Sequence, residues 1–358
     1  MNRRKFLAAF TLPILAGSGY AAWRGRDNPY YSGPVTSNFD GTRFFLDGHT
    51  IDTSRMDLIR WRMGGGKAKW PESFPSPHSD TPPQRVPDGT RISYIGHASV
   101  LIQTHGVNIL IDPVWSQRAS PVQFAGPARV NPPGVEFDKL PPIDAVLVSH
   151  NHYDHLDLAT LKRLATSAKH LLKIRFFAPL ANDAIMQGHD PAIRTQTFDW
   201  GGKVEIGRGV TVHFEPAYHW SARGLFDRRM ALWSAFVIET PSGKIYHIAD
   251  TAFADGALFQ QARAKHGDFR LAILPIGAYA PRWFMKRNHI DPDEAVAIMQ
   301  ACGTQEAMAH HWGTFQLTDE PVDEPPQLLA KALEREKVRV ERFKVMRPGG
   351  VLELGRLT

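Results

Sequence analysis

Four potential metal ligands fall within one short stretch of the chain, His150-Asn151-His152-Tyr153-Asp154-His155. The stretch follows an apolar run at residues 145–148 that has the character of a buried strand. In an extended turn the first two histidines point the same way and can chelate one ion, which leaves Asp154 and His155 to face a second. A histidine-rich surface loop without metal is the alternative interpretation, but this spacing behind a strand favours a binuclear site.

Two ions need more ligands than one loop supplies, so we expect the others at the ends of further strand-like runs, where binding loops normally lie. His219 follows the run 210–214, Asp250 ends the run 244–249, and His311 follows another apolar segment. Singly each is weak evidence, because a lone histidine after a strand is more often a hydrogen-bonded structural residue. As a set they complete two coordination spheres, in which the Asp250 carboxylate can bridge. Imidazole and carboxylate ligands without thiolate favour two zinc ions, with manganese or iron as alternatives.

The composition is that of an ordinary globular protein, with 358 residues of which 43% are hydrophobic and 22% charged. The lone cysteine, Cys302, excludes an internal disulfide and a cysteine-based metal site. The formal net charge of +6 suits an anionic membrane surface or a phosphate-bearing substrate. Because the basic residues are dispersed, the sequence lacks the basic stripe that is typical of nucleic-acid binding.

The amino terminus, residues 1–26, is predicted to be an export signal or a membrane anchor. Arg3 and Arg4 precede Phe6-Leu7 and an apolar stretch to about Ala22, and the pair resembles a twin-arginine signal. We therefore expect export to a bacterial periplasm, or anchoring at the inner membrane.

Residues 27–88 are rich in proline, glycine, serine and aspartate without sustained periodicity, which predicts an ordered wrapping segment. Residues 89–358 then form the main domain. Its first elements are predicted to be a hairpin of strand-like runs 91–102 and 107–111, joined by a turn at 104–106. A strand at 144–149 and a helix at 158–168, capped by Asp157, flank the histidine-rich loop.

Beyond these features the chain resembles the metallo-β-lactamase-fold hydrolases, and within them the N-acyl-phosphatidylethanolamine-hydrolysing phospholipase D family. The resemblance covers residues from about 90 to 320. It rests on Gly96-His97-Ala98-Ser99, Asp112-Pro113, Ser120-Pro121 with Gly126-Pro127, residues 140–157, residues 216–221, Ile276-Gly277-Ala278-Tyr279, Pro281-Arg282-Trp283-Phe284-Met285-Lys286, residues 289–295 and His311-Trp312-Gly313-Thr314-Phe315.

This resemblance implies an α/β fold, the four-layer αββα sandwich with metals at one edge. It assigns one ion to His150, His152 and His219 and the other to Asp154, His155 and His311, with Asp250 bridging. The implied reaction is zinc-dependent hydrolysis of N-acyl-phosphatidylethanolamine to N-acylethanolamine and phosphatidic acid, by water activated between the two ions. Phospholipid and a membrane surface would be its partners, and a homodimer is implied by analogy.

Several further roles follow from the resemblance. Asp154, Asp250 and His289 are expected to be catalytic, and Tyr279, Arg282, Trp283 and His289 to bind substrate. His97 and Asp157 are expected to orient ligand imidazoles through hydrogen bonds. Four of these residues have a structural alternative: His289 as a histidine before the helix start at Asp291-Pro292, Asp157 as a helix cap, His97 as a structural histidine, and Trp283 as part of an aromatic core.

One segment departs from the family pattern. Where the family usually has Gly-Asp-Thr-Gly-Tyr around the bridging carboxylate, this chain has Ala249-Asp250-Thr251-Ala252-Phe253. The ligand is kept, whereas backbone freedom and a phenol hydroxyl are lost. Two other functions remain alternatives: a lactonase or other ester or amide hydrolase of the same fold, and a non-catalytic metal-binding module, which would be expected to have lost ligands.

Overall fold

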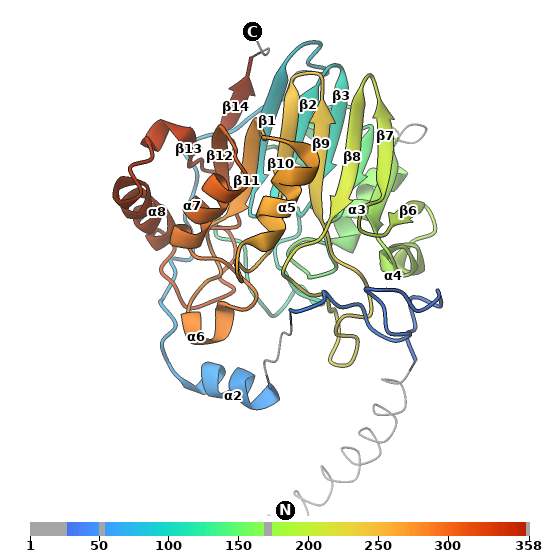
Figure 1. Cartoon of the computed structure of the whole chain (residues 1–358), viewed down its shortest axis with the longest axis vertical. Coiled ribbons are helices and arrows are strands. Elements are labelled where there is room, and N and C mark those ends of the chain that lie inside the picture. The colour runs from blue at the N-terminus through green and yellow to red at the C-terminus, as the bar shows by residue number, and fades with distance from the viewer. Residues whose placement is uncertain (1–26, 50–53, 168–173, 356–358) are drawn as a thin grey trace, which may run out of the picture.

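The computed structural model describes residues 27–49, 54–167 and 174–355, and the predicted signal at 1–26 lies outside them. Two seven-stranded mixed sheets pack face to face (Figure 1). The first sheet runs in the order β14 (Val351–Leu354), β1 (Thr90–Gly96), β2 (Ser99–Thr104), β3 (Val107–Ile111), β4 (Ala145–Leu147), β5 (Arg175–Pro179) and β6 (Thr195–Phe198). The second runs in the order β13 (Phe343–Lys344), β12 (Glu306–His310), β11 (Leu271–Pro275), β10 (Gly243–His247), β9 (Ala235–Thr240), β8 (Val210–Glu215) and β7 (Lys203–Gly207).

Helices cover both outer faces, so the predicted four-layer αββα sandwich is confirmed. Apolar residues of α3 (Leu158–Thr166) and α4 (Asn182–His189) share a core with the outer face of the first sheet. On the second sheet that role falls to α5 (Ala257–His266), α7 (Pro292–Ala301) and α8 (Glu324–Arg335). Two short helices, α2 (Arg55–Met63) and α6 (Arg282–Met285), lie instead at the lower end of the sandwich (Figure 1).

The core between the sheets is built from β-branched and aromatic side chains. Ile102 and Ile109 of the first sheet belong to the same buried cluster as Phe236 and Ile273 of the second, and all four are fully buried. Complete burial of such side chains contributes on the order of 1.5–3 kcal/mol each, so this layer fixes how the two sheets face one another.

The prediction of a single strand over residues 91–102 was wrong. The run is divided into the antiparallel pair β1 and β2, which turns at His97-Ala98. Gly96 has φ 130° and His97 has φ 57°, and a left-handed backbone here reverses the chain within two residues. The division matters for the site, because it places His97 at a strand end. The predicted helix after Asp157 is confirmed as α3, with Asp157 at its N-cap.

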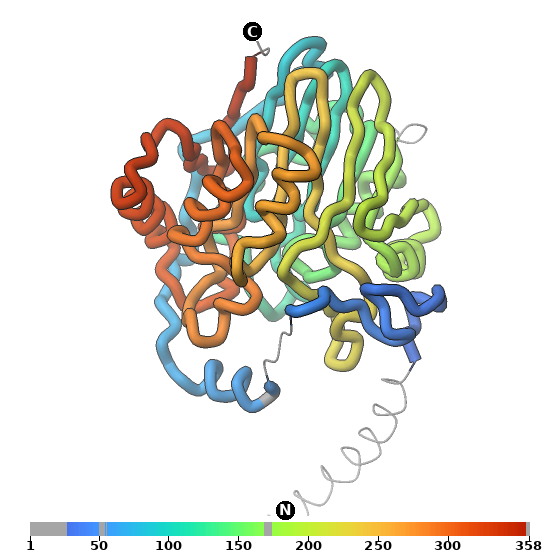
Figure 2. The backbone as a smooth tube through the Cα atoms, viewed as in Figure 1, coloured from blue at the N-terminus to red at the C-terminus, as the bar shows by residue number. Residues whose placement is uncertain are grey.

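Residues 27–49 and 54–88 lie along the lower end and side of the sandwich before β1 begins (Figure 2). Phe39 and Phe44 are buried in the core beneath the second sheet. Further along, Trp70 donates a hydrogen bond from Nε1 to the Glu320 carbonyl at 2.8 Å, and the backbone of Asp80 forms an isolated parallel β-bridge with Val135. Among the described residues, none of the helices has the length and apolar character that crossing a membrane requires.

Candidate metal centre

The predicted ligands come from loops at one end of the sandwich. Residues 150–157, here called the metal loop, connect β4 of the first sheet to α3. His219, Asp250 and His311 follow β8, β10 and β12 of the second sheet. The loop after β11 approaches the His311 loop so closely that a Cβ on Gly277 would lie 2.3 Å from the His311 carbonyl oxygen. Glycine at that position lets the two loops pack together.

The first group of side chains is His150, His152, His219 and Asp250. His150 Nε2 lies 2.9 Å from His152 Nδ1, which in turn lies 3.3 Å from His219 Nε2. The Asp250 Oδ2 atom is 3.8 Å from His150 Nε2 and 3.6 Å from His219 Nε2. Three ring nitrogens and one carboxylate oxygen therefore surround a single point.

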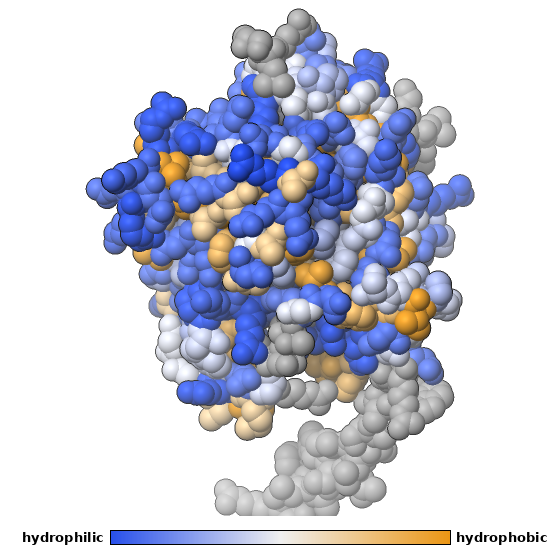
Figure 3. Space-filling model, in the orientation of Figure 1, coloured by the Kyte–Doolittle hydropathy of each residue, from blue (hydrophilic) through white to orange (hydrophobic). Residues whose placement is uncertain are grey.

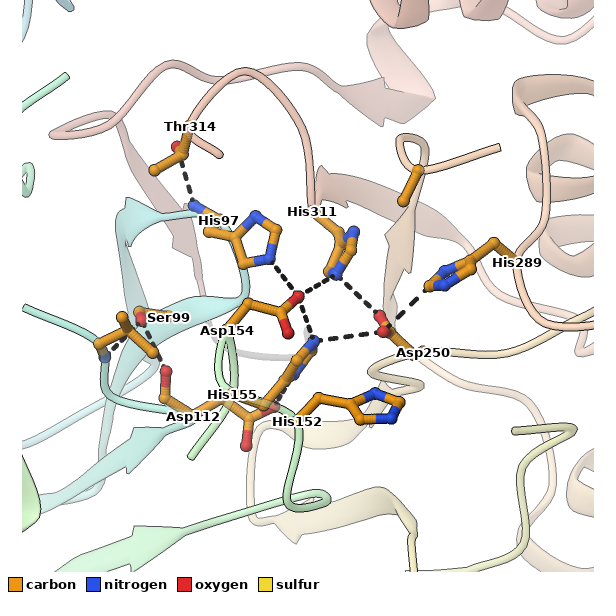
Figure 4. A network of polar contacts seen from close by, with 12 residues as sticks. His97, Ser99, Asp112, His152, Asp154, His155, Asp250, His289, His311 and Thr314 are labelled. Atoms are coloured by element: carbon orange, nitrogen blue, oxygen red, sulfur yellow. Dashed lines mark hydrogen bonds and ion pairs between the residues drawn. The ribbon is translucent and has the colours of Figure 1, made fainter. Parts of the chain in front are cut away.

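The second group is Asp154, His155 and His311, and it shares Asp250 with the first (Figure 4). Asp154 Oδ2 lies 3.2 Å from His311 Nε2 and 3.5 Å from His155 Nε2. Asp250 faces this group with both oxygens, since Oδ1 is 3.1 Å from His311 Nε2 and Oδ2 is 3.3 Å from His155 Nε2. The structure thus brings all seven predicted ligands together, in the two sets expected, with Asp250 between them.

Hydrogen bonds behind the cluster fix which nitrogen of each ring faces inward. His155 Nδ1 donates to Asp112 Oδ2 at 2.8 Å, and His219 Nδ1 donates to the Asn288 carbonyl at 3.0 Å. The Ser149 hydroxyl donates to Asp112 Oδ2 at 2.6 Å and can accept from His150 Nδ1 at 2.9 Å. In His150 and His219, Nε2 is left with a lone pair directed into the cluster, whereas His155 Nε2 faces the carboxylates of Asp154 and Asp250.

Asp112 and Ser149 were not predicted to serve the site. Asp112 was noted only as part of an Asp-Pro pair, and its partner His155 lies 43 residues further along the chain. Its position at the end of β3, which pairs with β4, is the signal that could have pointed to it. The carboxylate is fully buried, and it also accepts from the Ser149 backbone N–H at 2.7 Å.

His97 and Asp157 were predicted to orient ligand imidazoles, but the hydrogen bonds of both side chains go to other groups. His97 Nε2 lies 2.8 Å from Asp154 Oδ2, so His97 holds a predicted ligand carboxylate (Figure 4). Asp157 accepts instead from Ala159 N and Thr160 N in the first turn of α3, and from the Ser116 backbone N–H at 2.9 Å. Its contacts are those of a helix cap that also holds the loop after β3.

Burial keeps the three histidines of the first group neutral. It lowers the pKa of His150 and His219 well below the usual imidazole value, and that of His152 to about 4. At neutral pH these rings are therefore uncharged, which is the form that can coordinate a metal.

The second group holds charge. Burial opposes protonation of His155 and His311, but Asp250 and Asp154 outweigh it, so the pKa of His311 rises to about 9 and that of His155 lies well above its usual value. Burial would likewise raise the pKa of both carboxylates, yet the charged imidazoles hold Asp154 and Asp250 well below the usual range. Two buried anions are balanced by two protons, and cations placed there could replace those protons.

The donor set fits divalent ions of intermediate softness. Ring nitrogens that carry lone pairs converge at 2.9 and 3.3 Å in the first group, and in the second group His155 Nε2 and His311 Nε2 face the carboxylates of Asp154 and Asp250. Imidazole with carboxylate suits zinc, manganese or iron. The residues present therefore fit a two-metal centre and leave open which metal occupies it.

Among the predicted substrate-binding residues, His289 lies at the centre. Its Nδ1 is 3.9 Å from Asp250 Oδ2, and its ring centroid is 5.2 Å from that of His219. Arg282 donates to the His289 carbonyl at 2.8 Å and to Glu294 Oε2 at 2.7 Å, so the guanidinium holds the His289 segment in place. The Tyr279 hydroxyl donates to Glu324 Oε1 at 2.6 Å. Trp283 is 52% exposed on α6.

Comparison with known proteins gives consistent relatives. The model of the beta-lactamase superfamily domain matches residues 107–312. The chain is 37% identical over 274 residues to N-acyl-phosphatidylethanolamine-hydrolyzing phospholipase D 1 of Caenorhabditis elegans, a match that covers 74% of this chain and 76% of that protein. It is 30% identical over 265 residues to a metal-dependent hydrolase of Pyrobaculum arsenaticum, which covers 74% of this chain and all of that protein. The crystal structure of the diiron β-hydroxylase CmlA from Streptomyces venezuelae shares the fold, with a TM-score of 0.53, 19% identity, and coverage of 76% of this chain and 55% of that one.

Proposed function

This chain belongs to the metallo-β-lactamase superfamily and, within it, to the family of N-acyl-phosphatidylethanolamine-hydrolysing phospholipases D, and from that premise we propose that it is a binuclear metal-dependent phosphodiesterase of phospholipase D type. The coarser statement, a metal-dependent hydrolase, has independent support from the Pyrobaculum relative. The proposed reaction converts N-acyl-phosphatidylethanolamine to N-acylethanolamine and phosphatidic acid.

The observation that carries the proposal is the shared position of Asp250 between two groups of imidazoles. Two divalent ions bound there, which we propose to be zinc, would supply an acidified water and offset charge on phosphoryl oxygens. Asp154 belongs to the second group alone, and His97 fixes its carboxylate. His289 presents a buried Nδ1 with no hydrogen-bond partner among the described residues, and a substrate oxygen could approach it.

We propose that the substrate is taken from a phospholipid surface. Met56 and Met63 of α2 are 69% and 81% exposed, and Trp283 of α6 is 52% exposed. The two helices lie at the lower end of the sandwich (Figure 1), where the space-filling view shows apolar surface (Figure 3). Arg60 lies over the Trp283 ring at 5.1 Å, so a cationic and an apolar side chain are in contact on this end. Such a mixture suits the interface of an anionic bilayer. The predicted amino-terminal signal would bring the protein to the periplasmic side of the membrane or hold it there.

The first experiment measures release of N-acylethanolamine from vesicles of N-acyl-phosphatidylethanolamine by metal-loaded protein. We expect release that a chelator abolishes and that His152→Ala removes. His78→Ala, which changes an exposed histidine outside the cluster, is the matched control and should keep full activity. A protein that carries two metals per chain yet releases no product, while it hydrolyses a lactone or another ester, would refute the phospholipase D assignment.

A second experiment tests the surface. Met56→Glu combined with Met63→Glu should reduce co-sedimentation with anionic vesicles and leave hydrolysis of a short-chain, soluble phosphodiester unchanged. Val340→Glu is the matched control, because Val340 is 59% exposed and lies outside α2 and α6. Unchanged sedimentation of the double variant would exclude α2 from membrane contact.

A further inference from the structure

One arginine, Arg223, bonds to both ends of the metal loop. Its Nη1 donates to the Asn151 carbonyl and to the Leu156 carbonyl, each at 2.9 Å. These two carbonyls bracket residues 152–155, which carry predicted ligands to both ions. A single guanidinium nitrogen therefore sets the distance across the part of the loop where ligand geometry matters most.

Tyr153, which lies within residues 152–155, contacts the same arginine through both its ring and its hydroxyl. The guanidinium carbon lies 4.0 Å from the centre of the Tyr153 ring, and the Tyr153 hydroxyl donates to the Arg223 carbonyl at 2.9 Å. The ring is thus held between the side chain and the backbone of one residue. Stacking of this kind suits the planar guanidinium and is lost with a lysine.

Arg223 also belongs to the loop that supplies the ligand His219, four residues earlier. The Asp227 carboxylate accepts from the backbone N–H of Arg223 at 3.2 Å and of Gly224 at 2.8 Å, which closes a turn around the arginine. The Tyr30 hydroxyl donates to Asp227 Oδ2 at 3.1 Å, so the N-terminal segment supports that turn. The chain of contacts therefore runs from residue 30 to the metal loop.

The environment of the guanidinium is unusual for a cation. Burial lowers its pKa, and its acceptors are two carbonyls and an aromatic face. Partial removal of a cation from water is unfavourable unless its hydrogen bonds are made, and Arg223 makes them to the metal loop.

We propose that Arg223 is a positioning residue that fixes the spacing between the metal loop and the His219 loop, and thereby sets the affinity of both metal sites. The proposal rests on the ligand set of the proposed function but not on its substrate. Contacts that orient ligands from behind typically change metal affinity by 10- to 100-fold, about the size of effect expected here.

The test compares metal affinity and metal-free stability in matched variants. Arg223→Lys keeps the charge but has neither the planar fork nor the stacking surface, and it should lower metal affinity at least about tenfold in competition with a chromophoric chelator. Arg175→Lys is the control, because Arg175 also donates to two carbonyls, those of Glu205 and Ile206, far from the cluster. It should lower the melting temperature of the chelator-treated protein and leave metal affinity unchanged.

Tyr153→Phe gives a second, milder test in case Arg223→Lys fails to fold. It removes only the hydroxyl that bonds to the Arg223 carbonyl, so metal affinity should fall by less than in Arg223→Lys. Wild-type affinity in either variant, or an equal loss in Arg175→Lys, would overturn the proposal. Metal affinity is measured without substrate. A protein that fails to hydrolyse N-acyl-phosphatidylethanolamine would therefore refute the proposed reaction and leave the proposal for Arg223 standing. A wild-type protein that binds no divalent metal would overturn both proposals.

Discussion

Replacement of Asp112 by asparagine should weaken metal binding because it reverses the tautomer of the predicted ligand His155, which hydrogen-bonds to Asp112. Oδ1 of Asp112 accepts from the Ser149 backbone N–H, which can only donate, so the amide oxygen must take that position. The amide NH2 group of the variant then occupies the position of Oδ2. In the wild type the Ser149 hydroxyl and His155 Nδ1 both donate to Oδ2, so in the variant these donors would face another donor. His155 can relieve this conflict only by accepting at Nδ1, which moves its proton to the metal-facing Nε2.

The size of the effect follows from that geometry. Loss of an orienting carboxylate behind a metal-bound histidine costs roughly 10- to 100-fold in metal affinity, or about 1.4–2.8 kcal/mol. We expect this loss in Asp112→Asn by chelator competition, with metal content per chain as a second readout. The metal-free Asp112→Asn variant should be about 1–3 kcal/mol less stable to unfolding than the metal-free wild type, because its buried amide NH2 group faces other hydrogen-bond donors.

Asp80→Asn is the control for a general effect of neutralising a buried aspartate. Asp80 accepts from Arg91 Nη1 at 3.0 Å and Nη2 at 2.6 Å, and its side chain is only 7% exposed. This variant should lose stability and keep its metal affinity. If Asp112→Asn binds metal as tightly as the wild type, the tautomer reasoning is refuted, and an equal loss of affinity in both variants would refute its local origin.

Three further predictions follow from the structure. Asp250→Asn should abolish hydrolysis and reduce bound metal below two per chain, by elemental analysis, with far-UV circular dichroism unchanged; full turnover in this variant would rule out a bridging role. Ala249 has φ 56°, so Ala249→Gly should raise the free energy of unfolding by on the order of 1 kcal/mol in denaturant titration, and a lower value would show that the strain is absent. Burial opposes ionisation of Glu215, but His266 and Lys265 outweigh it and lower its pKa below the usual 4.5, so the carboxylate stabilises the fold above that pH and loses the effect as pH falls through its lower folded pKa. Glu215→Gln should therefore be less stable than wild type at pH 6 and equally stable in strong acid; a gap that persists in acid would point to packing instead of charge.

Residue type and position at strand ends were enough to predict which side chains meet at the centre. The metal loop follows β4, and His219, Asp250 and His311 follow strands of the other sheet, as their spacing behind apolar runs indicated. The loop chemistry is local, and parallel strands bring their carboxyl ends to one edge.

Other features depend on contacts between distant residues and left little trace in the sequence. The helix α2 was missed because its apolar residues do not mark a buried face; Met56, Leu58, Ile59 and Met63 are all exposed. It is held by a capping box between Ser54 and Asp57, and by Trp61, which donates to Asp319 at 2.9 Å and stacks on Phe284. The Ser-x-x-Asp spacing was the one local signal for its start. Asp112 and Arg223 act through partners that only the folded chain reveals.

The division of ligands between the two sheets has a consequence for how the protein unfolds. Each group takes two side chains from the metal loop of the first sheet and the others from loops of the second. An ion coordinated there would cross-link the two sheets, so that the sheets could separate only when the ion is released. Chelation should then accelerate unfolding more than it changes local flexibility, and amide hydrogens of β4 and β12 should lose their protection from exchange at the same rate.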